Sequence, residues 1–132
     1  MSEKSVSARA VPLGTWLADQ SDERLVRLLE LRPDLTQPPP GSIAALAARA
    51  QTRQSVKAVT DDLDFLHLAV LDALLLLQAD REPVPLSKLT SLIGDHGGDG
   101  RLEAAVAYLE ERALVWGDGV LRVTPEAASG LP

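Results

Sequence analysis

The chain has 132 residues, a formal net charge of −6, an apolar fraction of 45% and no cysteine. That length fits one ordinary domain or two small ones sharing a core, and the lack of Cys excludes a disulfide scaffold and thiolate metal sites. Met1–Ala10 does not resemble a signal peptide, and no apolar run reaches the roughly 20 residues of a membrane span. We therefore expect a soluble, cytoplasmic protein without membrane contact, with nucleoid association as an alternative.

The charge is unevenly distributed along the chain. Met1–Val59 holds eight Lys and Arg against six Asp and Glu, whereas Thr60–Pro132 holds five against thirteen. A phosphate-binding surface is therefore expected in the first half, if one exists.

Residues 11–61 predict an N-terminal helical subdomain, preceded by a disordered tail over residues 1–10. Ser21, Ser42 and Thr52 each stand before a helical pattern, as N-caps do, and Pro33 ends the helix that Ser21 begins. The apolar positions of the successive helices are Leu13, Trp16 and Leu17; Leu25, Leu28 and Leu29; Ile43, Leu46, Ala47 and Ala50; and Val56, Val59 and Leu63.

The stretch Leu63–Ala79 is expected to be the hub of the fold. Only Asp64, His67, Asp72 and Gln78 interrupt its apolar run, and at about 100° per residue they fall in a stripe roughly 140° wide. A helix of this kind must be covered on most of its surface. We therefore expect the segments before and after it to pack on it, and the preceding helix to lead directly into it.

Residues 62–132 predict a winged-helix-like subdomain. After the hub come a short extended piece at Pro83–Pro85, a helix with Leu89, Leu92 and Ile93 on one face, a helix over Leu102–Ala113, and a hairpin over Leu114–Val123. The expected fold is mainly α: an N-terminal helical bundle packs through the hub on a C-terminal winged-helix unit with one short β-hairpin.

The third helix of such a unit often enters the major groove of DNA, but these residues argue against it. With its apolar stripe inward, the helix presents Glu103, Ala104, Ala107, Tyr108 and Glu111 outward. A helix without Lys or Arg on that face is repelled by the phosphates. We interpret the face as a site for a protein partner, with Tyr108 as a candidate hot spot; alternatively, the Tyr108 ring lies along the hairpin and covers the core.

Basic residues in the first half form the candidate nucleic-acid site. Arg49, Arg53 and Lys57 are spaced by four, and Arg24 and Arg27 lie on another helix. If the two helices are neighbours, these side chains form a basic face. The alternative is a solvated surface with local ion pairs, in which Thr52 breaks the helix and scatters the stripe.

Signals of catalysis are weak. The chain has two His, and none of its serines lies in a recognisable nucleophile turn. The loop Gly94–Gly100 is glycine-rich but lacks the Lys-Ser/Thr of a nucleotide-binding loop, and His96 between Asp95 and Asp99 is a poor metal site. We predict a protein that is not an enzyme and has no metal and no cofactor.

Several motifs together carry a family resemblance. They are Leu31-Arg32-Pro33-Asp34-Leu35, Pro38-Pro39-Pro40, Leu46-Ala47-Ala48-Arg49-Ala50, Thr52-Arg53-Gln54-Ser55-Val56 and the Ala113–Gly119 hairpin. In these the chain, over roughly Val11–Pro132, resembles the N-terminal region of actinobacterial helicase-associated proteins, whose later parts are similar to the N-terminal region of XPB-type DNA helicases. The resemblance implies a non-catalytic module linked to DNA repair or transcription.

The residues of the acidic winged-helix face predict a protein-interaction module, and the resemblance implies that its partner is an XPB-type helicase or another repair or transcription protein. One alternative is a DNA-binding module that uses the basic N-terminal face. Another is a winged-helix transcriptional regulator whose helical half binds an effector or a dimer partner.

Overall fold

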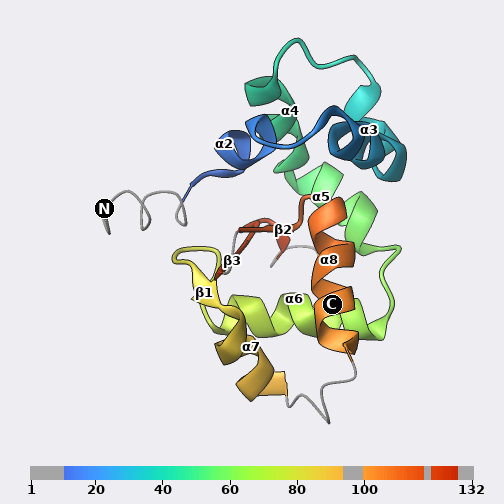
Figure 1. The fold of residues 1–132 in the computed structure, drawn as a ribbon. Coiled ribbons are helices and arrows are strands. Elements are labelled where there is room, and N and C mark those ends of the chain that lie inside the picture. Colours follow the sequence, from blue (N-terminus) through green and yellow to red (C-terminus); the bar gives the residue numbers. More distant parts are fainter. Residues whose placement is uncertain (1–10, 94–99, 118–119, 128–132) are drawn as a thin grey trace, which may run out of the picture.

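A computed structural model describes residues 11–93, 100–117 and 120–127. The predicted disordered tail, almost all of the Gly94–Gly100 loop and the hairpin tip at Asp118 lie outside these residues. The described chain is mainly helical, with a small antiparallel sheet. Figure 1 shows α2, α3 and α4 grouped at one end, α6 and α7 at the other, and α8 running between them.

The N-terminal helices begin where the cap residues predict. They are α2 (Leu13–Ala18), α3 (Asp22–Leu31), the 3-10 helix η1 (Pro33–Thr36), α4 (Ile43–Ala50) and α5 (Arg53–Thr60). The side chains of Ser21, Ser42 and Thr52 accept hydrogen bonds from the main-chain N–H three residues later, at 3.2, 3.0 and 3.3 Å. Each cap satisfies one of the N–H groups that a helix start leaves unpaired.

The C-terminal half alternates helices with short strands. Its elements are α6 (Phe65–Leu76), β1 (Val84–Pro85), α7 (Leu86–Ile93), α8 (Arg101–Glu111), β2 (Val115–Trp116) and β3 (Val120–Val123). The strands form one antiparallel sheet in the order β1-β3-β2, with Val84 opposite Leu121 and Val115 opposite Val123. The expected hairpin is therefore part of a three-stranded sheet, because the extended piece between the prolines pairs with β3.

Two hydrophobic cores organise the chain. The larger core joins α5, α6, α7, α8 and the sheet. The smaller core joins α2, α3, η1 and α4, and it also takes Ala113 and Trp116 from the C-terminal half. Val115 belongs to the larger core and Trp116 to the smaller, because successive residues of a strand point to opposite faces. The Trp116 Nε1 donates a hydrogen bond to the carbonyl of Val11 at 3.1 Å.

The hub meets only part of the predicted N-terminal bundle, because α5 shares the larger core with α6 and the smaller core contains no residue of α6. Helix α6 contributes residues to the larger core only, and α8 with β2 makes the junction. Helix α5 also belongs to the larger core through Val56 and Val59, although it lies in the predicted N-terminal subdomain. It does not continue directly into α6 either, since α5 ends at Thr60 and α6 begins at Phe65.

The hub is also less covered than predicted. Phe65 is 86% exposed and Leu76 is 70% exposed, and Leu92 of α7, predicted to face the core, is about half exposed at 49%. The reason is that α7, α8 and β3 cover one side of α6, while α2, α3 and α4 assemble around the smaller core. No helix of the described chain is both long enough and apolar enough to cross a membrane.

Candidate functional site

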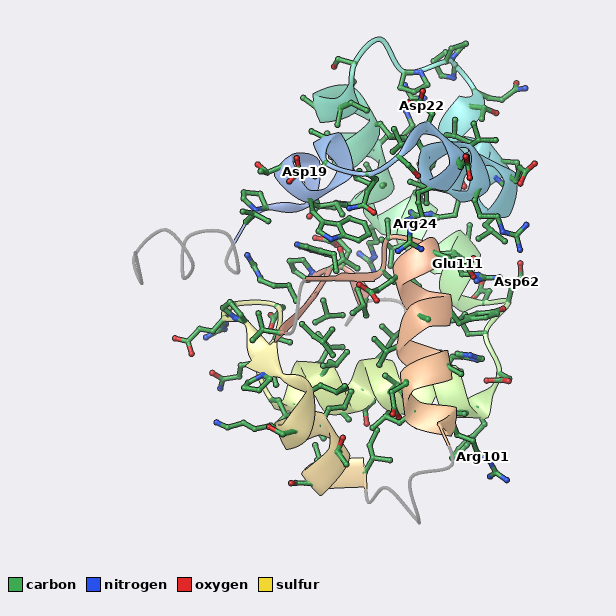
Figure 2. The ribbon with its side chains drawn as sticks, in the orientation of Figure 1. Asp19, Asp22, Arg24, Asp62, Arg101 and Glu111 are labelled. Carbon is green, nitrogen blue, oxygen red and sulfur yellow. The ribbon has the colours of Figure 1, made fainter. Side chains whose placement is uncertain are left out.

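The outward face of α8 is the candidate partner site, and we call Glu103, Ala104, Ala107, Tyr108 and Glu111 the acidic α8 face. Burial of Leu102, Ala105, Val106 and Leu109 fixes the orientation of the helix. Glu103, Ala104 and Ala107 are exposed. In Figure 2, Arg101 marks the N-terminal end of α8 and Glu111 the opposite end, at the junction with α3. The middle of the helix thus presents one carboxylate and two small side chains to solvent.

Tyr108 is held between two other side chains. Its ring stacks on His67 of α6 with a centroid distance of 3.9 Å and an interplanar angle of 26°. The guanidinium carbon of Arg112 lies 3.4 Å from the Tyr108 ring centroid. Since one face of a ring cannot hold both groups at these distances, the ring is sandwiched between them. Tyr108 therefore fastens α8 to α6, and only part of its ring is available to a partner.

Glu111 is engaged within the chain. Its carboxylate lies 3.7 Å from Arg27 Nε of α3 and 3.9 Å from Arg112 Nη1. Figure 2 shows Glu111 beside Arg24 at the junction between α3 and α8. Ion pairs with this exposure contribute at most about 1 kcal/mol. The structure therefore places Glu111 in the contact between the two halves, apart from the exposed middle of α8.

The five basic residues of the candidate nucleic-acid site have different surroundings. Arg49 donates hydrogen bonds to the carbonyls of Leu35 and Pro38, which ties α4 to the preceding connector. Lys57 pairs with Asp61 at 3.3 Å, and Arg27 pairs with Glu30 as well as Glu111. Arg24 and Arg53 are exposed. The helix is interrupted at Gln51 and Thr52, between α4 and α5. Arg49 and Arg53 therefore lie on different helices and do not form one continuous stripe.

Sequence analysis missed Arg32, the most deeply buried charged residue of the described chain at 1% exposure. Its Nη1 donates to the carbonyl of Arg112 at 2.8 Å, and its Nη2 donates to the carbonyl of Ala50 at 2.7 Å and to Ser55 Oγ at 2.8 Å. Ser55 Oγ in turn donates to Asp34 Oδ2 at 2.5 Å. The signal was present: Leu25, Leu28, Leu29 and Arg32 follow the spacing of one helix face.

Burial sets the electrostatics of Arg32. Desolvation lowers the pKa of its guanidinium to about 10, and the nearby carboxylate of Asp34 opposes that shift. The side chain is therefore a cation at neutral pH. Its acceptors suit a cation, because Ala50 ends α4 and Arg112 follows α8, and helix C-termini carry partial negative charge.

An open depression of about 230 Å³ lies beside this network, lined by Leu31, Arg32, Pro33, Asp34, Ala58, Val59 and Asp62. The two terminal nitrogens of Arg32 are committed to protein acceptors, and its Nε is enclosed without a hydrogen-bond partner in the described chain. Among the residues that line the depression, the ionisable groups exposed to solvent are thus Asp34 and Asp62. These features do not suit an anionic ligand.

Asp64 begins α6. Its carboxylate accepts the main-chain N–H of His67 at 3.0 Å and lies 2.5 Å from His67 Nδ1. The main-chain hydrogen bond from His67 is the chief reason that the pKa of Asp64 is lowered below its ordinary value. Since His67 also stacks on Tyr108, this cap positions the contact between α6 and α8.

No group of three or more His, Asp or Glu side chains within residues 11–93, 100–117 and 120–127 is arranged to hold a metal ion. The weak candidate around His96 lies outside the described residues. Comparison with protein-family models finds no matching family, and comparisons with curated proteins and with solved structures find no match either. The helicase-associated resemblance therefore stays a prediction that rests on its motifs.

Proposed function

We propose that this chain is a non-catalytic protein-interaction module of a cytoplasmic protein linked to DNA repair or transcription. Its C-terminal half acts as a winged-helix unit in which α8 contacts a partner protein. Support comes from the order α6, β1, α7, α8, β2, β3, which is the helix-strand-helix-helix-hairpin order of such units. The partner class follows from the motif resemblance: an XPB-type helicase, or another repair or transcription protein.

One observation carries the choice of a protein over DNA. The exposed middle of α8 presents Glu103, Ala104 and Ala107 without Lys or Arg; the cations nearby are Arg101 at the start of the helix and Arg112, whose guanidinium lies on the Tyr108 ring. Duplex DNA carries one negative charge per about 1.7 Å of its axis, so a carboxylate at this position opposes groove entry. Small side chains beside an exposed carboxylate instead suit a close-packed contact with a basic protein surface.

The test is the affinity for a purified XPB-type helicase, measured by biolayer interferometry for the wild type and for Glu103→Lys/Ala107→Arg. These two residues are chosen because Tyr108 and Glu111 also hold the fold together. We expect the double variant to bind at least about tenfold more weakly. Glu82→Lys, which reverses an exposed acid outside α8, is the matched control. Equal affinity of the double variant and the wild type would remove α8 as the contact.

A parallel measurement addresses DNA. Fluorescence anisotropy with single-stranded, duplex and forked DNA, at low and near-physiological salt, should show little binding. Salt-sensitive binding that weakens when the exposed Arg24 and Arg53 are replaced would instead favour the basic N-terminal helices. In that case each phosphate contact removed should lower the log–log salt slope by about 1.

A further inference from the structure

One face of α6 carries three exposed side chains, Phe65, Asp72 and Leu76, with the half-buried Ala69 among them. Phe65, Ala69, Asp72 and Leu76, which we call the α6 stripe, are spaced by four, three and four residues and so share a face. The opposite face holds the buried residues Val70, Leu71, Ala73 and Leu74. At 1.5 Å per residue, Phe65 and Leu76 lie about 16 Å apart along the helix.

The composition of the α6 stripe suits a binding surface. Phe65 and Leu76, at its two ends, are among the most exposed large apolar residues of the described chain. Burial of a Phe or Leu side chain is favourable, and exposed apolar groups aligned on one helix face can be buried together by one partner. Asp72 lies between them, exposed, with no hydrogen bond or ion pair in the described chain. The stripe is thus apolar, anionic, apolar.

The charge of the segment that contains the stripe indicates that the partner is positively charged. From Asp61 to Asp80 the chain contains no Lys or Arg, and its acids are Asp61, Asp62, Asp64, Asp72 and Asp80. Of these, Lys57 pairs with Asp61, and His67 contacts Asp64. Asp72 retains an uncompensated charge at the centre of the stripe. A complementary surface must place a cation there, between two apolar side chains.

Two other occupants fit less well. In a symmetric pair of antiparallel α6 helices, the stripe centres coincide and the two Asp72 carboxylates lie within about one helical turn of each other, which adds like-charge repulsion to two chains of net charge −6. An anionic membrane surface repels the same carboxylates. A basic polypeptide has neither problem.

We propose that the α6 stripe binds a basic amphipathic helix of a partner protein. In the complex, two apolar side chains of that helix, spaced about three turns apart, cover Phe65 and Leu76, and a Lys or Arg between them pairs with Asp72. This surface is separate from the acidic α8 face, so it does not depend on the function proposed above.

The test uses designed, fluorescein-labelled helical peptides. The first, called the Lys peptide, is a cationic helix with two Leu residues eleven positions apart and a central Lys between them on the same face. The second, called the Glu peptide, has Glu in place of that central Lys. Anisotropy should show that the Lys peptide binds the wild type more tightly. Asp72→Lys should weaken the Lys peptide about tenfold and strengthen the Glu peptide, which is the reciprocal pattern of a direct charge contact.

Phe65→Ser/Leu76→Ser tests the apolar contacts, and Val26→Ser, which removes an exposed apolar side chain of α3, is its matched control. We expect Phe65→Ser/Leu76→Ser to lose most of its binding to the Lys peptide and Val26→Ser to keep it. Circular dichroism should confirm that both variants are folded. Unchanged binding by the stripe variant, or equal binding of both peptides, would overturn the proposal. So would a dimer in light scattering that Leu76→Ser dissociates, or binding of the wild type to anionic vesicles that the stripe variant abolishes. Glu103→Lys should leave peptide affinity unchanged, which separates this surface from α8.

Discussion

Arg32 and Arg112 are eighty positions apart in the chain, yet the guanidinium of the first donates a hydrogen bond to the main-chain carbonyl of the second at 2.8 Å. The same guanidinium binds the carbonyl of Ala50 and the hydroxyl of Ser55. One buried guanidinium thus donates hydrogen bonds to carbonyls at the C-terminal ends of α4 and α8, and its bond to Ser55 joins both ends to α5. A group with so many buried partners is expensive to remove.

We predict that Arg32→Met destabilises the fold by about 3 kcal/mol or more, because it leaves the buried Ala50 carbonyl, the partly buried Arg112 carbonyl and the Ser55 hydroxyl without their donor. The free energy of unfolding in urea measures this. Arg53→Met is the control, since Arg53 is exposed at the start of α5, and its loss should change stability by about 0.5 kcal/mol or less. Similar values for the two variants would show that the Arg32 network is dispensable.

Tyr108 gives a second prediction. Tyr108→Phe keeps the ring between His67 and Arg112 and should be nearly neutral, whereas Tyr108→Ala removes the stacked ring and should cost about 2 kcal/mol. Thermal unfolding of both variants measures the difference. In a double-mutant cycle with His67→Ala, coupling of about 0.5–1 kcal/mol is expected, and additive effects would contradict the stacking interaction.

Asp64 makes stability depend on pH in the acid range. Because the fold lowers the Asp64 pKa below 3.8, its carboxylate contributes fully above that pH, and the contribution is lost as pH falls through the lowered value. Asp64→Asn keeps a cap for the His67 N–H but cannot ionise. The stability gap between wild type and Asp64→Asn should therefore be present at about pH 6 and narrow as the pH falls below 3.8. A stability difference between the two proteins that does not change with pH would show that it does not come from the ionisation of Asp64.

Gly117, just after β2, is predicted to resist substitution. Its φ is +142°, and a Cβ placed there would lie 1.9 Å from the carbonyl oxygen of Val120. Gly117→Ala should cost about 3 kcal/mol through strain and displacement of the strand. Gly41→Ala is the matched control, because a Cβ at Gly41 meets nothing within 4 Å. Its unfolding midpoint should stay the same or rise slightly, and an equal loss in both variants would contradict the steric argument.

Local signals predicted much of this fold. Caps at Ser21, Ser42 and Thr52 and the apolar spacing of α8 depend only on neighbours in the chain, so the starts of these helices and the outward face of α8 follow from the sequence. The mainly helical character of the chain is confirmed.

Contacts between residues far apart in the chain were harder to predict from the sequence. The polar stripe of α6 indicated a side left uncovered, but its pattern could not show that Phe65 and Leu76 beside Asp72 would also stay exposed, and both were expected to be buried. The contacts of Glu111 with Arg27, of Tyr108 with His67 and of Arg49 with Leu35 join different elements, and no spacing within one helix reveals them. Arg32 was the exception, since its place on the apolar face of α3 indicated burial.

The two-residue strand β2 has a consequence for how the chain can be divided. Val115 is part of the larger core and Trp116 is part of the smaller core. Fraying of β2 therefore exposes both cores to solvent at once. We therefore expect a single, coincident unfolding transition by tryptophan fluorescence and by far-ultraviolet circular dichroism. A fragment ending at residue 61 would lack Trp116 and Ala113, leaving Leu13, Leu17 and Leu28 without part of their packing. We expect each half to be less stable when the other is removed.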